Sequence, residues 1–466
     1  MKRRDFINTG LLAAIGGTFA SANTISTIEK NKQLFRGKAK NIIFLVSDGM
    51  SIGTPTMTDL LMQRKYGQES RWMSLYRENK VCHALMDTAS ADSLVTDSAA
   101  AASAWGGGVR VKNGALNMGP NGVEHQPILQ KFKAAGKKVG CVTTVPITHA
   151  TPAGFSVNMK NRGLQDKIAD KYLELRFDVM MGGGQEYFDG TKRSDKKDIF
   201  PDFKAAGFSV VRNKKEMELL EAGQPVLGVF SESGLPFSLD QHSDKELTEN
   251  IPALAEMTDT AINLMKDNQD GFVLQVEGGK VDWAAHANDT GALLYDQMAF
   301  DKAVEVAVRF AEKRNDTLVI ITTDHGNANP GLIKSKKVDQ KFNLIQTFKH
   351  TNEWILNSIK PSDTPANVIE RINYAQGYAI TEEEAKTLLK AYVSFDNNGL
   401  YNAYNLPFRQ LAQIQEEYIS VYWAGMNHSA DFVTLSMFGV ETEALPPLVK
   451  NYELHNYMLK AAGVLK

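Results

Sequence analysis

Short apolar runs alternate along the chain with longer segments in which apolar residues recur at helical spacing. The short runs are bounded by turn residues, as the buried strands of a parallel sheet are. We predict strands at residues 41–47, 138–145, 177–181, 208–211, 225–230, 271–276 and 317–322. The clearest helices are expected at 252–266 and 292–313, the second with an apolar stripe between charged positions. This alternation predicts an α/β fold, a doubly wound three-layer sandwich with a mostly parallel central sheet.

Three of the predicted strands run into acidic side chains. Asp48 follows 41–47, Glu277 follows 271–276, and Asp324 comes one threonine after 317–322. A single acidic residue after a strand is usually only a turn or cap residue. In an open parallel sheet, however, the carboxyl ends of the strands form the edge at which ligands bind. Three carboxylates at that edge together predict a metal site.

Histidines accompany these carboxylates. His325 directly follows the last of the three acids. Asp282 and His286 are four residues apart, so one helical turn would place both on the same face. His428 lies just before a further strand-like run at 432–438. Carboxylate and imidazole together suit zinc, whereas carboxylate with hydroxyl and water suits magnesium.

A serine stands where a helix is expected to begin. Asp97 and Ser98 open an alanine-rich segment, and the N-terminus of a helix favours an anion. A serine hydroxyl there is a candidate phosphoryl acceptor if metal ions lower its pKa. The alternative interpretation is that Asp97 is only the N-cap of this helix. The metal-ligand motifs elsewhere in the chain favour the nucleophile.

These motifs, in this order, make the chain resemble an alkaline phosphatase from about residue 41 to the C-terminal region. The most specific motif is Val95-Thr96-Asp97-Ser98-Ala99-Ala100. The resemblance implies that Ser98 attacks the phosphorus and becomes a phosphoserine. It implies one zinc ion at Asp282, His286 and His428; a second at Asp48, Asp324 and His325, beside Ser98; and a third metal, usually magnesium, at Asp48, Thr151 and Glu277.

The family also has an arginine that contacts two phosphate oxygens. The segment 148–154 resembles the family's magnesium-site motif, and Arg162 lies thirteen residues after His149, at a spacing that resembles the family's own. A planar guanidinium binds two oxygens at once, which lysine does not. We therefore assign this role to Arg162; Lys160 is the nearest rival.

Two positions depart from the best-known bacterial pattern. His149 stands near the third metal site where many bacterial enzymes have aspartate and animal enzymes have histidine. Imidazole favours zinc over magnesium, so the third metal could be either ion. Trp283 stands where other members have a lysine or histidine that reaches the phosphate through water. Because indole offers a single N–H donor, we expect weaker binding of the phosphate product.

The N-terminus is typical of an export signal. Residues 1–22 combine a basic start containing Arg3 and Arg4, a short apolar run and a small-residue cleavage site. The paired arginines favour the twin-arginine route, and a Sec signal is the alternative. Either route predicts a protein outside the cytoplasm, in the periplasm, with residues 23–40 as a tail. No later segment has about twenty continuous apolar residues, so we expect no membrane span.

Net charge and the spread of the motifs bear on which partners the protein binds and on how many domains it forms. The formal charge of −2 gives no sign of a nucleic-acid-binding surface. The metal motifs are spread from Asp48 to His428, so residues 41–466 must close into one catalytic domain. Helices are expected at 342–360, 381–392 and 406–422, within an insertion at about 330–420. By resemblance to the family, this crown-like insertion covers the site and meets a second subunit in a homodimer.

The two cysteines leave two interpretations open. Cys82 and Cys141 both lie in apolar, strand-like runs. A periplasmic setting permits a disulfide between them. Buried free thiols are the favoured interpretation, because a chain exported by the twin-arginine route folds first in the reducing cytosol.

The expected reaction is hydrolysis of small-molecule phosphate monoesters to an alcohol and inorganic phosphate. A phosphodiesterase of the same superfamily is the first alternative. A sulfatase is disfavoured because Ser98 is followed by alanines rather than by Pro-x-Arg. A periplasmic protein that binds metal or phosphate without turnover is the second alternative, and the Asp97–Ser98 pair argues against it.

Overall fold

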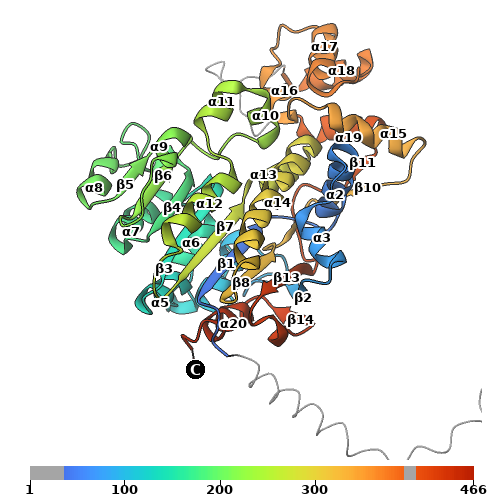
Figure 1. Cartoon of the computed structure of the whole chain (residues 1–466). Coiled ribbons are helices and arrows are strands. Elements are labelled where there is room, and N and C mark those ends of the chain that lie inside the picture. The colour runs from blue at the N-terminus through green and yellow to red at the C-terminus, as the bar shows by residue number, and fades with distance from the viewer. Residues whose placement is uncertain (1–35, 393–405, 466) are drawn as a thin grey trace, which may run out of the picture.

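A ten-stranded sheet forms the centre of the protein (Figure 1). The structure is a computed structural model that describes residues 36–392 and 406–465. The strand order is β14-β2-β13-β8-β1-β7-β3-β4-β6-β5. The strands are β1 (Asn41–Ser47), β2 (Cys82–Asp87), β3 (Lys138–Pro146), β4 (Val179–Gly183), β5 (Ser209–Val211), β6 (Val226–Val229), β7 (Phe272–Gly278), β8 (Thr317–Thr322), β13 (Val433–Gly439) and β14 (Leu448–Lys450). Only β13 runs antiparallel to its neighbours, so the predicted mostly parallel sheet is confirmed.

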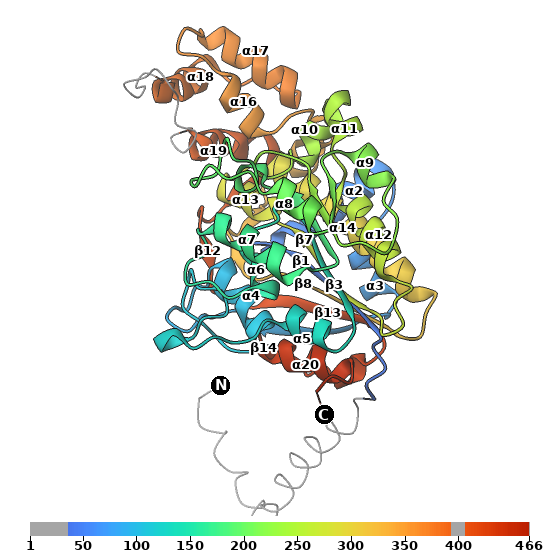
Figure 2. The ribbon, with the colours of Figure 1, turned by 90° about the vertical axis from the view of Figure 1, so that its left-hand side faces the viewer.

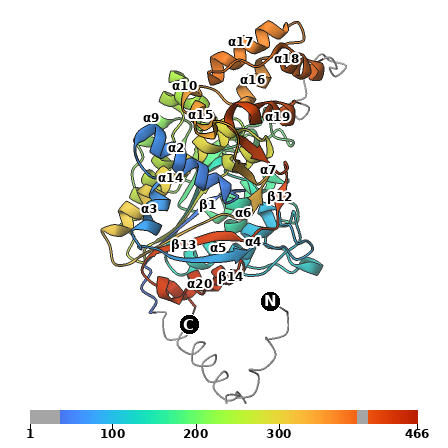
Figure 3. The ribbon, with the colours of Figure 1, turned by 90° about the vertical axis from the view of Figure 1, so that its right-hand side faces the viewer.

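Side chains alternate between two apolar cores along the central strands, as the period of a strand requires. On β1, Ile43 and Leu45 face one core, and Ile42, Phe44 and Val46 face the other. The first core is covered by α2 (Gly53–Tyr66), α3 (Arg71–Arg77), α12 (Leu254–Met265) and α14 (Thr290–Glu312). The second is covered by α4 (Ser98–Gly107), α5 (Ile128–Ala134), α6 (Ala150–Ser156), α7 (Gln165–Leu175) and α20 (Glu453–Ala461). Figures 2 and 3 show the two helical layers on opposite sides of the sheet.

The predicted elements of the core lie close to those observed. The strand predicted at 317–322 has the bounds of β8, and the strand predicted at 271–276 is β7 with two further residues. The helix expected at 292–313 begins at Thr290, because the side chain of Asp289 accepts a hydrogen bond from the Ala292 N–H. Shorter helices join the layers: α8 (Phe200–Ala205), α9 (Lys214–Glu218), α10 (Ser238–Ser243), α11 (Lys245–Asn250) and α13 (Lys280–His286).

Further helices lie beyond one end of the sheet, at the top of Figure 1. They are α15 (Val338–Asn343), α16 (Asn352–Ser358), α17 (Pro365–Gln376), α18 (Glu382–Leu389) and α19 (Phe408–Ile419). The prediction of one helix at 342–360 was wrong, because the helix is interrupted there. Thr351 caps a new helix by accepting a hydrogen bond from the Trp354 N–H. The helix predicted at 406–422 ends at Ile419, because Ser420 adopts a left-handed conformation with φ 59°. The next residues form β11 (Val421–Trp423), paired with β10 (Pro330–Leu332).

The remaining predictions concern the N-terminus, part of the insertion, the two cysteines and a membrane span. The signal at 1–22, most of the tail at 23–40 and residues 393–405 of the insertion lie outside the described residues. Cys82 and Cys141 are both free cysteines, as the favoured interpretation has them, but only Cys141 is fully buried and Cys82 is half-buried. In the described part of the chain, no helix combines the length and apolar character that crossing a membrane requires.

Candidate active site

The three predicted carboxylates come from adjacent strands. Asp48 follows β1, Glu277 lies near the end of β7, and Asp324 lies just beyond β8, with β1 hydrogen-bonded between the other two strands. All three side chains are almost fully buried. Both carboxylate oxygens of Asp48, one of Glu277 and one of Asp324 have no hydrogen-bond partner. Buried, unpartnered carboxylates are costly, so this edge of the sheet is built to receive cations.

Electrostatics support the same conclusion. Burial raises the pKa of Asp48 well above its ordinary value, and repulsion from Asp324, Asp282 and Glu277 raises it further. Positive ions among these oxygens would reverse that effect. Gly49, with φ 64°, allows the close approach, because a Cβ there would lie 2.8 Å from the Asp282 Cβ. Like charges are therefore held together by the fold, ready to be neutralised by bound cations.

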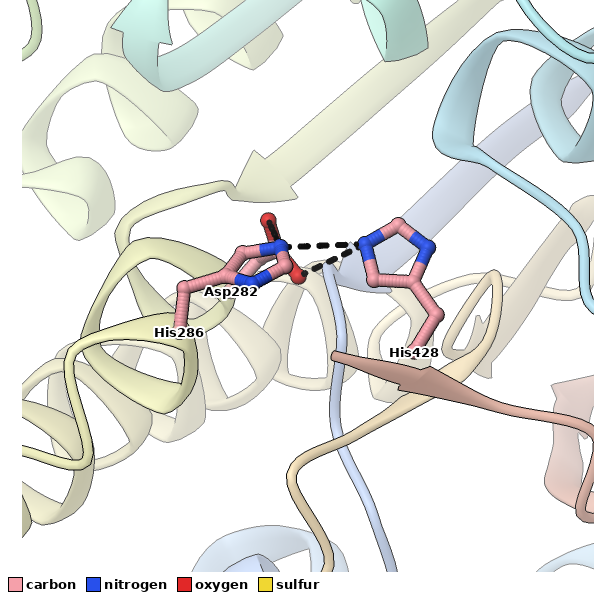
Figure 4. A group of neighbouring side chains, drawn as sticks. All are labelled: Asp282, His286 and His428. Atoms are coloured by element: carbon pink, nitrogen blue, oxygen red, sulfur yellow. Dashed lines mark hydrogen bonds and ion pairs between the residues drawn. The ribbon is translucent and has the colours of Figure 1, made fainter. Parts of the chain in front are cut away.

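A first group of metal-ligating atoms comes from α13 and the short strand β12 (His428–Ser429) (Figure 4). The Nε2 atoms of His286 and His428 are 3.1 Å apart, and both face the carboxylate of Asp282 at 3.5 and 3.7 Å. The Nδ1 of His286 lies 2.7 Å from the Met426 carbonyl, and that of His428 lies 2.8 Å from the Thr96 carbonyl. Because a carbonyl only accepts, each Nδ1 carries the proton and each Nε2 offers its lone pair.

A second group surrounds Ser98. His325 Nε2 lies 3.2 Å from Asp324 Oδ2 and 3.7 Å from Asp48 Oδ1. Ser98 Oγ lies 3.3 Å from the same His325 nitrogen, and the serine is 2% exposed. Asp282 also contributes a ligand atom to this group, so it faces both the first and the second group. The four residues predicted for the second metal site are thus together, with one carboxylate more than predicted.

A third group lies on the other side of Asp48. Asp48, Glu277 and His149 offer ligand atoms within 4.8 Å of one another, and His149 Nδ1 is 3.9 Å from Glu277 Oε1. Thr151 Oγ1 is buried at the start of α6 without a hydrogen-bond partner, as a metal-ligating hydroxyl would be. The other Glu277 oxygen accepts a 2.5 Å hydrogen bond from Thr143. The structure therefore adds His149 to the ligand atoms predicted from the sequence.

Ser98 begins α4, and Asp97 is the N-cap. Asp97 Oδ1 accepts from the Ala100 N–H at 2.9 Å, which is the capping role considered from the sequence. Its Oδ2 accepts from the Gly114 N–H at 3.0 Å and from Arg162 Nη1 at 3.1 Å. The same carboxylate therefore caps the helix and holds the arginine, so the two interpretations of Asp97 are compatible. The helix N-terminus directs its positive dipole end at the serine.

Arg162 extends from Asp97 to His149. Its Nη2 lies 3.0 Å from His149 Nε2, whereas the rival Lys160 is exposed. The Trp283 ring meets the His149 ring edge-on, with centroids 6.3 Å apart and planes at 78°. The guanidinium is thus held by an imidazole on one side and, on the other, by the acid that directly precedes Ser98 in the chain.

The sequence alone missed several residues of this site. Asn327 donates from Nδ2 to Asp282 Oδ1 at 2.7 Å, and its place two residues after His325 in the same motif could have suggested it. Thr143 lies inside a predicted strand, where no pattern distinguishes it from a core residue. Lys280, buried at the start of α13, was likewise not predicted as part of the site.

Comparison with known proteins identifies the family. The family model described as alkaline phosphatase matches residues 39–464. Alkaline phosphatase 4 of Bacillus subtilis is 30% identical over 95% of this chain and 93% of its own length. The Escherichia coli alkaline phosphatase is 30% identical over 68% of this chain and 78% of its own. The crystal structure of Thermus thermophilus alkaline phosphatase superposes with a TM-score of 0.85 at 29% identity, covering 92% of both chains. The chain belongs to the alkaline phosphatase family and hydrolyses phosphate monoesters.

Proposed function

We propose that Ser98 accepts the phosphoryl group of a monoester, and that two zinc ions and a third metal ion occupy the three groups of ligand atoms around it. The observation that carries this proposal is the position of Ser98 Oγ. It lies 3.3 Å from His325 Nε2, at the N-terminus of α4 and beside buried carboxylates without partners. A nucleophile, a cation site and a helix dipole thus meet at one atom.

The chemistry of each group supports a choice of metal. We assign zinc to Asp282, His286 and His428 and to Asp48, Asp324 and His325, because both sets mix imidazole with carboxylate. We assign magnesium to the group of Asp48, Thr151 and Glu277, whose oxygen atoms suit that ion. His149 Nδ1 in the same group also makes zinc acceptable there. A variant alkaline phosphatase from an Antarctic bacterium is described with Mg bound in its M3 site after one histidine was replaced by aspartate, so it does not decide the metal at a group that contains His149.

The reaction divides into two transfers. When bound, the metal ions supply positive charge that lowers the pKa of the serine hydroxyl and stabilises the leaving oxygen. Ser98 Oγ forms a bond to phosphorus in line with the departing alcohol, giving a phosphoserine. Water then attacks the phosphoserine from the opposite side, releasing phosphate and restoring Ser98. Arg162 binds two oxygens of the transferred group in both steps, and Asp97 keeps the guanidinium in place.

The wider organisation follows the family resemblance. We propose a homodimer in which the insertion of each subunit meets the other. Tyr374, 56% exposed on α17 at the outer end of the molecule, is available for such a contact. We also propose that residues 1–22 are an export signal, that residues 41–466 form one catalytic domain, and that the protein is located in the periplasm. Sedimentation of the purified protein tests the dimer, because a monomer at micromolar concentration contradicts it.

A serine substitution tests the nucleophile. We expect Ser98→Ala to lower p-nitrophenyl phosphate turnover by several orders of magnitude while the bound zinc content stays unchanged. Ser93→Ala, an exposed serine five residues earlier, is the matched control and should keep full activity. Chelation should abolish turnover by the unaltered protein, and added zinc should restore it. Unchanged turnover in Ser98→Ala would remove this serine from the mechanism.

The same assay with a diester substrate distinguishes a phosphomonoesterase from a phosphodiesterase. With bis-p-nitrophenyl phosphate as substrate, we expect much slower turnover than with the monoester, because a diester carries a second organic group in place of one of the three free oxygens and has less negative charge for the cations of the site to attract. A preference for the diester would make phosphodiesterase the main activity. Zinc binding without turnover of either substrate would favour the non-catalytic alternative.

A further inference from the structure

Lys280 is a buried cation beside the active site that the proposed reaction does not use. It begins α13 and is only 4% exposed. Its Nζ lies 3.5 Å from the centroid of the Phe237 ring and 4.6 Å from that of the Trp283 ring. Lysine is seldom fully buried unless it is paired, and an aromatic face attracts an ammonium most strongly where water is absent. The two rings therefore hold this ammonium, and the ammonium holds the rings.

The half-buried indole of Trp283 has two further contacts. A Cβ on Gly234 would lie 2.8 Å from the indole Cζ3, so the backbone of the 231–237 loop packs directly against the ring. The indole also meets the His149 ring edge-on at 6.3 Å. His149 Nε2 in turn lies 3.0 Å from Arg162 Nη2. A continuous series of contacts thus runs from the buried ammonium to the phosphate-binding guanidinium.

We propose that Lys280 is a positioning residue for phosphate binding, which holds Trp283 against His149 and thereby fixes His149 and Arg162. This inference rests on the role proposed above for Arg162. Trp283 stands where other members carry a cation that reaches the phosphate, and it brings no charge of its own. The nearby cation, Lys280, has its ammonium over the rings of Phe237 and Trp283. Its effect on the substrate must therefore be exerted through the position of the ring.

Replacement of the ammonium by an apolar group of similar length tests this role. We expect Lys280→Met to weaken inhibition by inorganic phosphate about threefold to tenfold and to raise KM similarly, within the range of a desolvated cation–π contact. Methionine removes both the buried charge and its attraction to Asp296, and these two effects on the melting temperature oppose each other. The melting temperature therefore serves to check that the variant is folded. Lys280→Arg keeps the cation and should stay within about twofold of the unaltered enzyme.

A control and a second background make the test specific. Lys65 also lies over an aromatic ring, 4.7 Å from the centroid of Tyr295, but has no contact with the phosphate-binding residues. Lys65→Met should leave phosphate inhibition unchanged. If Lys280 acts through the indole, then Lys280→Met should have no further effect on phosphate inhibition in a Trp283→Leu background.

Each outcome decides between the explanations. Lys280→Met that lowers the melting temperature and kcat while phosphate inhibition stays unchanged would show a merely structural residue and overturn the inference. Equal losses in the presence and absence of Trp283 would overturn the route through the indole. Different results would contradict the proposed function itself: turnover retained by Ser98→Ala, or no turnover by the metal-loaded unaltered enzyme.

Discussion

Asp296 is a buried acid whose ionisation should destabilise the protein as pH rises. It lies on α14, is 4% exposed, and accepts hydrogen bonds from the Ser238 N–H at 3.0 Å and from Ser238 Oγ at 3.3 Å. Burial raises its pKa from the ordinary 3.8 to about 7, and attraction to Lys280 only partly opposes this effect. An asparagine side chain at this position would not titrate, so we choose the substitution Asp296→Asn as the perturbation.

The sign follows from linkage. The Asp296 carboxyl binds its proton more tightly in the folded state than in the unfolded state. The stabilisation that this proton binding gives to the fold is therefore complete at pH values below the pKa of the carboxyl in the unfolded chain. It is lost as pH rises through the folded pKa near 7. A shift of about 3 units at about 1.4 kcal/mol per unit gives roughly 4 kcal/mol in all. Of this, about 2–3 kcal/mol falls between roughly pH 5 and pH 8.

Asparagine keeps both contacts with Ser238. Its carbonyl oxygen can accept from the N–H, and its amide can donate to the hydroxyl. We therefore expect the free energy of unfolding of Asp296→Asn, relative to the unaltered protein, to improve by about 2–3 kcal/mol from roughly pH 5 to pH 8. Urea unfolding at several pH values measures this difference, and the pH dependence of metal binding largely cancels between the two proteins.

A matched control is Asp259→Asn on the adjacent helix α12, whose carboxylate is 54% exposed. The same urea unfolding series on this variant measures the effect of removing an exposed carboxylate from a neighbouring helix. A pH-independent difference for Asp296→Asn would mean that the buried carboxyl ionises at its ordinary pKa. Such a result would refute the argument from burial.

Two further substitutions test the phosphate-binding residues. Arg162→Lys should raise KM for p-nitrophenyl phosphate and weaken phosphate inhibition by about tenfold or more, because an ammonium cannot bind two oxygens in the fixed geometry of a guanidinium. Steady-state kinetics measure both constants, and an unchanged KM would exclude the two-oxygen contact. Trp283→Lys should tighten phosphate inhibition, because it places a cation where other members have one. An inhibition constant no lower than that of the unaltered enzyme would contradict this explanation of weak product binding.

The arrangement of the catalytic core could be predicted because the central strands β1, β7 and β8 are buried on both faces. Such strands read as continuous apolar runs, and β8 was located to the residue. The runs of β1 and β8 also lead into the site, so Asp48 and Asp324 indicated which end of each strand carries the function. Local pattern and global fold therefore agree in this part of the chain.

The insertion was harder to predict because its helices are short and their bounds depend on caps. The break after Leu344–Thr347 depends on Thr351, whose hydroxyl starts a new helix in a segment that reads as one long helix. Helix α17 was not predicted, although Thr364 with Pro365 at the first helical position is a recognisable start signal. A prediction based on the spacing of apolar residues does not detect helix starts that depend on one capping residue.

Side chains that act on other side chains leave the weakest sequence signal. Thr143 and Asn327 each hold a metal-site carboxylate, yet each is a single polar residue in an otherwise ordinary segment. Their roles depend on which strands and loops become neighbours. The antiparallel pairing of His428 with Asn327 joins two segments about a hundred residues apart. Such contacts emerge only from the folded structure.

The strand order explains why the site is built around Asp48. Strand β1 lies between β8 and β7, so the carboxylate at its end is adjacent to Asp324 on one side and to Glu277 on the other. A central position gives Asp48 a ligand atom in both the second and the third group, whereas a strand farther from the centre could serve only one. Both of its oxygens are buried and without hydrogen-bond partners, as this double role requires. If the three groups hold the metal ions proposed above, a carboxylate there would hold the third ion close to the ion beside Ser98, and both would supply positive charge to the same phosphoryl group.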